Sequence, residues 1–328
     1  MDAIDYLDLD VAYLLGLIVA RGEISFSEGG LNKIIIEFPF RNQKVKGITI
    51  KIDQKDQILL NLRHIFRRIN ELTSINFREE EGDSSISLIL ETPKNTMFLR
   101  NINFLLKGKK SYKEFSIPEE IFNAPSEFQK EFLRGFSDVA GSARAANAYI
   151  SGQHRIYLDV LNQNWQLPIQ LCYLLQDKLK IPVQTITYGH PNLRDPQLND
   201  YNKGKVGWSR EHQIKIFAEN FNEIGFYVRH KQNVLDELAN FNEDNFKHNE
   251  KYCEPPKSIR KIKPIHPEEN SDKLPDVLKG QHCDTYWQIC GLLGCSRYKN
   301  NIKASKKRKV SDKLKSVARR RRPKKKTK

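Results

Sequence analysis

The chain has 328 residues, a formal net charge of +15, 39% hydrophobic residues and 10% aromatic residues, which is enough apolar material for a sizeable core. No apolar run reaches the roughly 18 residues that a membrane-spanning helix needs, and the acidic start Met1-Asp2-Ala3-Ile4-Asp5 does not resemble a secretory signal. The five cysteines form no disulfide framework of the secreted type, so we expect an intracellular protein, cytoplasmic in a bacterium and nuclear in a eukaryote.

The first 110 residues predict helices and strands in the order αββαββα. Apolar residues at helical spacing predict three helices, over Leu14–Gly22, Gln57–Leu72 and Pro93 to about Leu106. Alternating apolar residues and turn residues predict two hairpins between them, formed by Glu23–Glu28 with Lys33–Phe40 and by Ser74–Glu79 with Ser85–Glu91.

Residues 111–247 predict the same order. The expected helices are Ser126–Val139, Leu167–Leu179 and Arg210–Ile224. The expected strands are Ala143–Ser151, His154–Val160, Pro182–Tyr188 and Lys205–Ser209. Agreement between two halves of a chain is stronger support than either half alone, because single predictions are often wrong.

Two nine-residue segments about 120 residues apart share one pattern, an apolar helix with glycine at its third and ninth positions. They are Leu14-Leu15-Gly16-Leu17-Ile18-Val19-Ala20-Arg21-Gly22 and Leu133-Arg134-Gly135-Phe136-Ser137-Asp138-Val139-Ala140-Gly141. Both resemble the signature helix of the LAGLIDADG homing endonucleases, DNA-cutting proteins built from two such repeats. The resemblance covers roughly residues 7–247. It implies an α+β fold in which pseudo-symmetric αββαββα repeats, residues 1–110 and 111–247, form a saddle that binds double-stranded DNA.

In the resembled family the two signature helices pack side by side. Small residues at that contact allow two helix backbones to approach closely. The residues that would serve this purpose here are Gly16, Ala20, Gly135 and Ala140.

The catalytic positions of the resembled family are altered in this chain. The eighth residue of each signature is normally the acid that binds the catalytic metal, and here it is Arg21 or Ala140. Neither supplies the carboxylate oxygen that Mg²⁺ requires. Asp138 and Glu23 lie two residues away from the expected positions and are the fallback catalytic acids. We therefore assign no metal site and expect binding without a cofactor, with Mg²⁺ needed if the protein cleaves.

Strand residues that face away from the core would reach DNA across the saddle, where arginine and glutamine suit base edges and lysine suits phosphate. Arg21 would attract a phosphate from a helix end. The expected DNA contacts are Arg21, Lys33, Glu37, Arg41, Arg144, Arg155, Tyr157, Gln184, Tyr188, Arg194, Lys205 and Arg210.

The last 81 residues differ in composition from the two repeats. Residues 248–300 predict a linker and a small helical element. Their irregular cysteine and histidine spacing contains no CxxC pair, which argues against zinc without deciding the matter for Cys253, His282, Cys283, Cys290 and Cys295.

The basic tail, residues 301–328, carries 15 Lys and Arg with one acid, while the first 300 residues hold 40 basic and 39 acidic residues. We expect the tail to be disordered alone. It would bind phosphates without sequence preference or act as a nuclear address. Because the body is nearly neutral, DNA binding by the two repeats requires a local basic patch.

The sequence favours a monomeric, sequence-specific binder of double-stranded DNA that has lost its catalytic acids. It would act as a regulator or as the recognition part of a restriction-type system with a methyltransferase or nuclease partner. Two alternatives stay open, an active Mg²⁺-dependent endonuclease with relocated acids and an RNA-binding helper of intron splicing. The sequence does not predict the target site.

Overall fold

The computed structural model describes residues 7–26, 31–45, 48–72, 75–93, 96–144, 154–161, 166–190 and 211–245. The predicted linker, small helical element and basic tail lie outside these residues. The cysteines and histidine considered for zinc lie there too, as do the expected DNA contacts Arg194, Lys205 and Arg210. No helix within the described ranges is long and apolar enough to cross a membrane.

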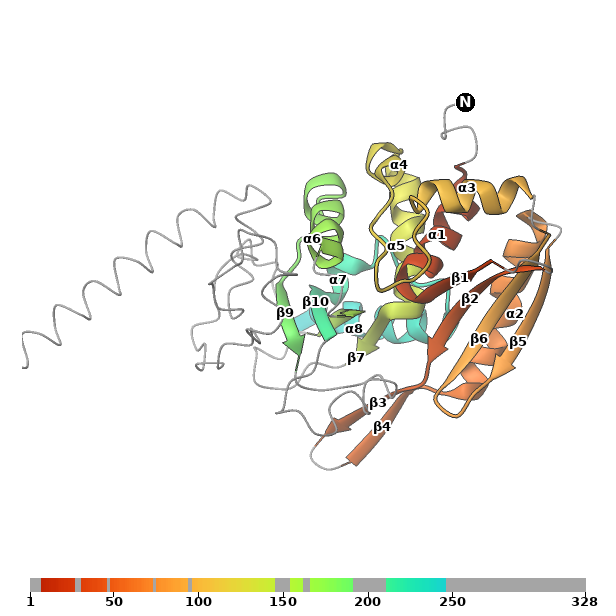
Figure 1. The fold of residues 1–328 in the computed structure, drawn as a ribbon. Helices are drawn as coiled ribbons and strands as arrows, with labels where there is room; N and C mark the ends of the chain where they lie inside the picture. The colour runs from red at the N-terminus through yellow and green to blue at the C-terminus, as the bar shows by residue number, and fades with distance from the viewer. Residues whose placement is uncertain are drawn as a thin grey trace, which may run out of the picture.

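The predicted α+β class is confirmed, with two four-stranded antiparallel sheets in the orders β1-β2-β6-β5 and β7-β8-β10-β9 (Figure 1). The strands of the first sheet are β1 (Gly22–Ser25), β2 (Asn32–Pro39), β5 (Asn76–Glu81) and β6 (Ser85–Thr92). Those of the second sheet are β7 (Gly141–Arg144), β8 (Arg155–Leu161), β9 (Thr185–His190) and β10 (Glu211–Phe217). A separate hairpin, β3 (Arg41–Val45) with β4 (Ile48–Asp53), extends from the first half.

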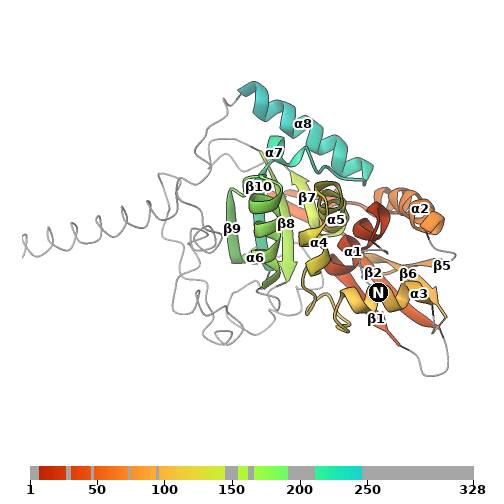
Figure 2. The ribbon, with the colours of Figure 1, turned by 90° about the horizontal axis from the view of Figure 1, so that it is seen from above.

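Two helices, α1 (Leu9–Arg21) and α5 (Ser126–Ala140), pack against each other in the middle of the molecule (Figure 2). The Asp8 side chain caps α1 by accepting a hydrogen bond of 2.7 Å from the Val11 N–H. The other helices are α2 (Lys55–Leu72), α3 (Met97–Leu105), α4 (Glu119–Asn123), α6 (Gln166–Tyr173) with a π-helical turn over Leu174–Lys178, α7 (Ala218–Phe221) and α8 (Arg229–Asn245).

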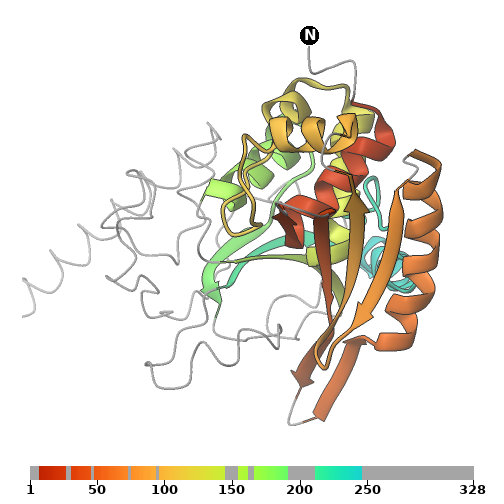
Figure 3. The same cartoon turned by 45° about the vertical axis from the view of Figure 1, so that its right-hand side comes forward.

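Each sheet has an apolar inner face and a polar outer face, because side chains alternate along a strand. In β2, Ile34 and Ile36 are buried against α1, while Lys33 faces outward. Helix α2 lies along the same sheet (Figure 3). In the second sheet Ile156 and Leu158 lie in the core. Each inner face packs against helices of its own half, and the two halves meet chiefly through α1 and α5.

The end of the second half differs from the prediction. The segment expected as a helix over Arg210–Ile224 forms strand β10 followed by the short α7, and the expected strand Lys205–Ser209 lies outside the described residues. Ile214 and Ile216 alternate with polar neighbours, and β10 pairs with both β8 and β9. Sheet pairing on both sides therefore determines the structure of this segment, and α8 is the long terminal helix of this half.

Candidate nucleic-acid interface

The central helices touch backbone to backbone at two glycines. A Cβ atom added to Gly16 would lie 2.1 Å from the Phe132 carbonyl oxygen, and one added to Gly135 would lie 2.0 Å from the Tyr13 carbonyl oxygen. Both distances are far shorter than a van der Waals contact, so glycine is required at each position. Ala20 and Ala140, nearer the helix ends, are buried.

The eighth residues of the two signature segments supply no carboxylate at the carboxyl ends of α1 and α5. Arg21 is the last residue of α1 and is buried, with its guanidinium carbon 5.5 Å from the ring centroid of Tyr112. Ala140, the last residue of α5, is buried as well. A cation and a methyl group thus stand at these positions.

Asp138 is held by hydrogen bonds to other parts of the protein. The Tyr13 hydroxyl donates to its Oδ2 at 2.7 Å, and the Val228 N–H donates to its Oδ1 at 3.1 Å. Burial raises the pKa of Asp138 to about 6, although the bonds from Tyr13 and Val228 and the charge of Lys231 act in the opposite direction. Asp138 therefore connects α1, α5 and the segment before α8.

The other fallback acid, Glu23 of β1, accepts a hydrogen bond of 2.7 Å from the Ser111 hydroxyl. Within the part of the chain that the structure describes, no three His, Cys, Asp or Glu side chains are grouped so that they could hold a metal ion. The donors present do not fit a divalent cation at the helix ends.

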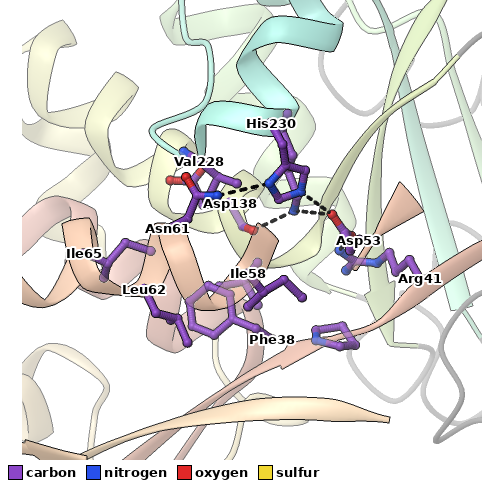
Figure 4. A pocket seen from close by; sticks show the side chains of 13 residues that line it. Phe38, Arg41, Asp53, Ile58, Asn61, Leu62, Ile65, Asp138, Val228 and His230 are labelled. Carbon is purple, nitrogen blue, oxygen red and sulfur yellow. Dashed lines mark hydrogen bonds and ion pairs between the residues drawn. The ribbon is translucent and has the colours of Figure 1, made fainter. Parts of the chain in front are cut away.

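A buried charge network connects β3, β4 and α8 (Figure 4). Its centre is Asp53 of β4, which lies 3.2 Å from Arg41 Nη1, 2.9 Å from His230 Nε2 and 3.8 Å from Lys231 Nζ. Burial alone would raise the pKa of Asp53, but Lys231, His230 and Arg41 together lower it well below its usual range. The network thus joins the β3–β4 hairpin of the first half to α8 of the second.

The hydrogen bonds of the neighbouring Asn61 indicate the tautomer of His230. The Arg229 N–H donates to Asn61 Oδ1 at 2.8 Å, so the Asn61 amide nitrogen faces His230 Nδ1, 3.1 Å away. His230 Nδ1 is therefore the acceptor, and Nε2 carries the proton that is donated to Asp53.

Lys231 places a positive charge at the carboxyl end of α5. Its Nζ donates to the carbonyl oxygens of Asp138 at 2.6 Å and Gly141 at 2.8 Å, at the negative end of the α5 dipole. Burial lowers the pKa of Lys231 to about 8, although the charge of Asp53 raises it. The adjoining cavity, lined in part by Arg41, Asp53, Asp138 and Lys231, measures about 10 Å³ and has room for a single water molecule.

The outer face of the second sheet carries a different set of charges. In register, Tyr157 lies between Ser142 and Lys215, and Arg155 lies opposite Arg144. The guanidinium carbon of Arg144 is 3.7 Å from the centroid of the Tyr157 ring, and Lys215 Nζ is 5.9 Å from it. We call Arg144, Arg155, Tyr157 and Lys215 the outer cationic cluster.

Asp159 is the carboxylate beside this cluster. Gln213 Nε2 donates to its Oδ1 at 2.8 Å, and Arg41 Nε lies 3.9 Å from its Oδ2. Burial raises the pKa of Asp159, while the charges of Arg41 and Arg144 oppose that effect. Burial and the charges of Arg155 and Arg144 lower the pKa of Lys215 to about 7.

The first sheet pairs its outer charges within its own surface. Lys33 Nζ lies 3.3 Å from a carboxylate oxygen of Glu91, and Arg78 Nε lies 3.1 Å from the same group. Arg78 also forms an ion pair with Glu80. Glu37 is half-buried on β2.

The structure brings several of the expected DNA contacts together. Arg144, Arg155 and Tyr157 share the second sheet, and Gln184 accepts a hydrogen bond of 2.9 Å from Arg155 Nη1. Tyr188 belongs to β9, and its side chain lies outside the described residues. Lys33 and Glu37 belong to the other sheet.

Sequence reasoning missed Asp53, Lys215, His230 and Lys231. Alternation with Ile214 and Ile216 would have placed Lys215 on the outer face, had that segment been predicted as a strand. Nothing in the local sequence shows that Asp53, His230 and Lys231 meet, because β4 and α8 are more than 170 residues apart.

No protein-family model matches the chain. In sequence it is 24% identical over 187 residues to a probable translation initiation factor IF-2 from Methanocaldococcus jannaschii, over 56% of this chain and 15% of that protein.

Comparison with solved structures finds similarity to LAGLIDADG proteins. Full-length DUF199/WhiA from Thermatoga maritima matches with 14% identity, 74% coverage of this chain, 62% coverage of that chain and a TM-score of 0.39. A mesophilic variant of the homing endonuclease I-DmoI matches with 15% identity, 71% coverage of this chain, 98% coverage of that chain and a TM-score of 0.35. I-GzeII in complex with its DNA target matches with 10% identity, 71% coverage of this chain, 90% coverage of that chain and a TM-score of 0.33. The predicted resemblance is thereby confirmed as a structural similarity.

Proposed function

We propose that this protein binds double-stranded DNA along the outer face of the β7–β8–β10 sheet and leaves the DNA uncut. The observation that carries the proposal is the outer cationic cluster, which lies on the opposite side of the sheet from the buried Ile156 and Ile214. Arginine, lysine and tyrosine on one sheet face provide groups that contact phosphates and base edges.

The geometry of a strand suits a duplex. Side chains on one face of a strand repeat every two residues, or roughly 6.8 Å, which is about two base-pair steps of 3.4 Å along DNA. A pair of antiparallel strands also fits the major groove, which is about 12 Å wide. Arg155 and Tyr157 of β8, with Lys215 of β10, are placed for successive contacts of this kind.

Three of the four members of the cluster are buried. Arg144 is 4% exposed, Arg155 is 3% exposed and Tyr157 is 7% exposed, whereas Lys215 is half-buried. Direct contact with DNA therefore requires that Arg144, Arg155 and Tyr157 become accessible when the complex forms. We expect both arginine side chains to be protected from arginine-modifying reagents in the free protein and to respond to DNA binding.

Binding without cutting follows from the helix ends. Metal-assisted cleavage needs oxygen ligands beside the scissile phosphate. Arg21 and Ala140 provide none, and both carboxylate oxygens of Asp138 accept hydrogen bonds within the protein. Lys231 sits on the carbonyl oxygens of Asp138 and Gly141, so another cation there would be repelled. Such a binder would serve as a regulator or as the recognition component of a restriction-type system.

The test is a selection from random duplex DNA at moderate salt, carried out once with Mg²⁺ and once with EDTA, in which bound and cut molecules are both counted. We expect one enriched duplex, bound equally in both buffers and recovered intact. Cleavage at the enriched site would contradict the proposal. Absence of enrichment, or preference for a structured RNA competitor, would contradict it as well.

A further inference from the structure

The β3–β4 hairpin lies apart from both four-stranded sheets and projects beyond them (Figure 1). Within the described residues its two strands pair only with each other. A two-stranded hairpin is marginally stable alone in water, so the direction of this one depends on how its base is held.

The base of the hairpin is the buried pair of Arg41 and Asp53, which lie opposite each other in the β3–β4 register. Arg41 Nη1 lies 3.4 Å from the Gly141 carbonyl oxygen of β7, and Arg41 Nε lies 3.9 Å from Asp159 Oδ2 of β8. Asp159 stands two residues after Tyr157 on β8 and therefore shares its face of the second sheet. The hairpin of the first half is thus fixed beside the face that carries the outer cationic cluster.

The two faces of the hairpin differ in chemistry. Residues opposite each other in an antiparallel pair share a face, as do alternate residues along one strand. By register one face holds Asn42, Lys44, Thr49 and Lys51, and the other holds Gln43, Val45, Ile48 and Ile50. The segment between Arg41 and Asp53 contains three lysines and no acidic residue. One face is therefore polar and cationic, and the other is mostly apolar.

We propose that the β3–β4 hairpin is a second DNA contact, in which Lys44 and Lys51 bind the phosphate backbone of the duplex held on the second sheet. The inference rests on the proposed function and adds a binding element outside the two four-stranded sheets. Lysine is a compact point charge that suits phosphate oxygens. Diagonal neighbours across an antiparallel pair, as Lys44 and Lys51 are, lie about 7–8 Å apart, which is close to two base-pair steps of ~3.4 Å along one DNA strand.

A phosphate contact adds affinity without sequence preference. Each neutralised phosphate steepens the dependence of the logarithm of the affinity on the logarithm of the salt concentration by about 0.9. Removing both lysines should therefore weaken binding to the selected duplex and to an unrelated duplex by the same factor, and leave the ratio of the two affinities unchanged. A substitution that only disturbed the second sheet would lower that ratio instead.

The experiment measures the Kd of the selected duplex and of a scrambled duplex by fluorescence anisotropy at pH 7, between about 50 and 200 mM salt. For Lys44→Gln/Lys51→Gln we expect both duplexes to bind roughly 10- to 50-fold more weakly at about 0.15 M salt, with the salt slope reduced by about 2. Lys44→Arg/Lys51→Arg keeps the charge and should keep the slope. Two controls should bind as wild type: Gln43→Ala on the opposite face of the hairpin, and Lys130→Gln on α5, whose Nζ lies 3.0 Å from a carboxylate oxygen of Glu223.

Lysine acetylation of the wild-type protein tests the same contact without any substitution. With sulfosuccinimidyl acetate and mass spectrometry, we expect Lys44 and Lys51 to be modified several-fold more slowly when the selected duplex is bound. Lys130 should be modified at the same rate with and without the duplex. Equal rates at Lys44 and Lys51 in the free and bound protein would overturn the contact.

The outcomes separate the two proposals. Wild-type binding with an unchanged Kd and salt slope in Lys44→Gln/Lys51→Gln overturns the hairpin contact and leaves the proposed function standing. A loss confined to the selected duplex, or an equal loss in Gln43→Ala, overturns the hairpin contact as well. Failure of the wild-type protein to bind any duplex overturns both proposals. Thermal unfolding verifies that each variant is folded, and the acetylation experiment decides if the double variant is not.

Discussion

The two sheets share a plan but differ on their outer faces. Each is antiparallel and four-stranded, and each buries an apolar inner face. The first sheet pairs Lys33 and Arg78 with Glu91, so its surface charges are balanced locally. The second gathers Arg144, Arg155 and Lys215 on one face, and the charges of the two arginines lower the pKa of Lys215.

The difference shows which features a repeated fold preserves. Inner-face residues are constrained in both halves by packing against helices, and a shift of one residue would expose the core. The residues on the opposite faces differ between the two sheets, so a function can reside in one sheet and be absent from the other. The repeats are thus alike in their framework and unlike in their chemistry.

The largest loss in the free energy of unfolding is expected at the buried ion pairs between the two halves. Asp53→Ala removes the carboxylate that Arg41, His230 and Lys231 surround, and it leaves the positive charges of Arg41 and Lys231 buried. We expect the free energy of unfolding at pH 7 to fall by about 3–5 kcal/mol in urea denaturation. Glu81→Ala, which breaks an exposed pair with Lys55, is the control. A loss below about 1 kcal/mol for Asp53→Ala would show that the network does not hold the halves together.

The helix contact should be equally sensitive from both sides. Gly16→Ala and Gly135→Ala each place a methyl group about 2 Å from a backbone oxygen of the opposite helix. We expect each substitution to reduce the free energy of unfolding by about 3 kcal/mol, because the backbones must separate. Gly82→Ala, whose nearest neighbour would be 3.4 Å away, should have little effect. Clearly unequal losses at the two helix positions would contradict the symmetry of this contact.

One position of the helix pair is asymmetric, since Asp138 stands where the first signature has Val19. The pKa of Asp138 is raised from 3.8 to about 6, so the folded protein binds this proton more tightly than the unfolded chain. The resulting stability is present below pH 4 and is lost as the pH rises to 6, by roughly 3 kcal/mol. In Asp138→Asn this loss should disappear when unfolding is measured from pH 4 to pH 7. The same pH profile in variant and wild type would refute the assignment.

The smallest loss in the free energy of unfolding is expected for a surface ion pair of the first sheet. Lys33→Ala removes one ion pair between Lys33 and Glu91 at a half-exposed site. Such pairs contribute less than about 1 kcal/mol, and added salt should reduce the effect further. Urea denaturation at low and high salt would measure it, and a loss above 2 kcal/mol would mean that the first sheet depends on its surface charges.

Local patterns predicted most of the framework. The helical spacing of Gln57–Leu72 and the alternation in β2 and β8 give the correct elements, because both patterns reflect which face is buried. The prediction of a helix around Ile214 and Ile216 is wrong. A short apolar run fits both the helical and the strand period, and the pairing of β10 with β8 and β9 makes this segment a strand.

The candidate site was less accessible to sequence reasoning. Arg144, Arg155 and Tyr157 were predicted from alternation on their strands, and the structure places them in one cluster. The burial of Arg41 against Asp53 and Asp159 depends on contacts between distant segments, which no local pattern reveals. No local pattern reveals either that Lys231 of α8 donates hydrogen bonds to the carbonyl oxygens at the carboxyl end of α5.

The central claim, that the second sheet is the DNA-binding face, is tested most directly by a matched pair of arginine substitutions. Arg155→Ala on β8 and Arg78→Ala on β5 each remove one outer-face guanidinium, and the Kd of each variant for the selected duplex would be measured at pH 7 in one buffer. We predict that Arg155→Ala weakens binding by about 10- to 100-fold, the usual range for one specific arginine contact, while Arg78→Ala stays within about twofold of wild type. Equal losses in the two variants, or a loss confined to Arg78→Ala, would contradict the account.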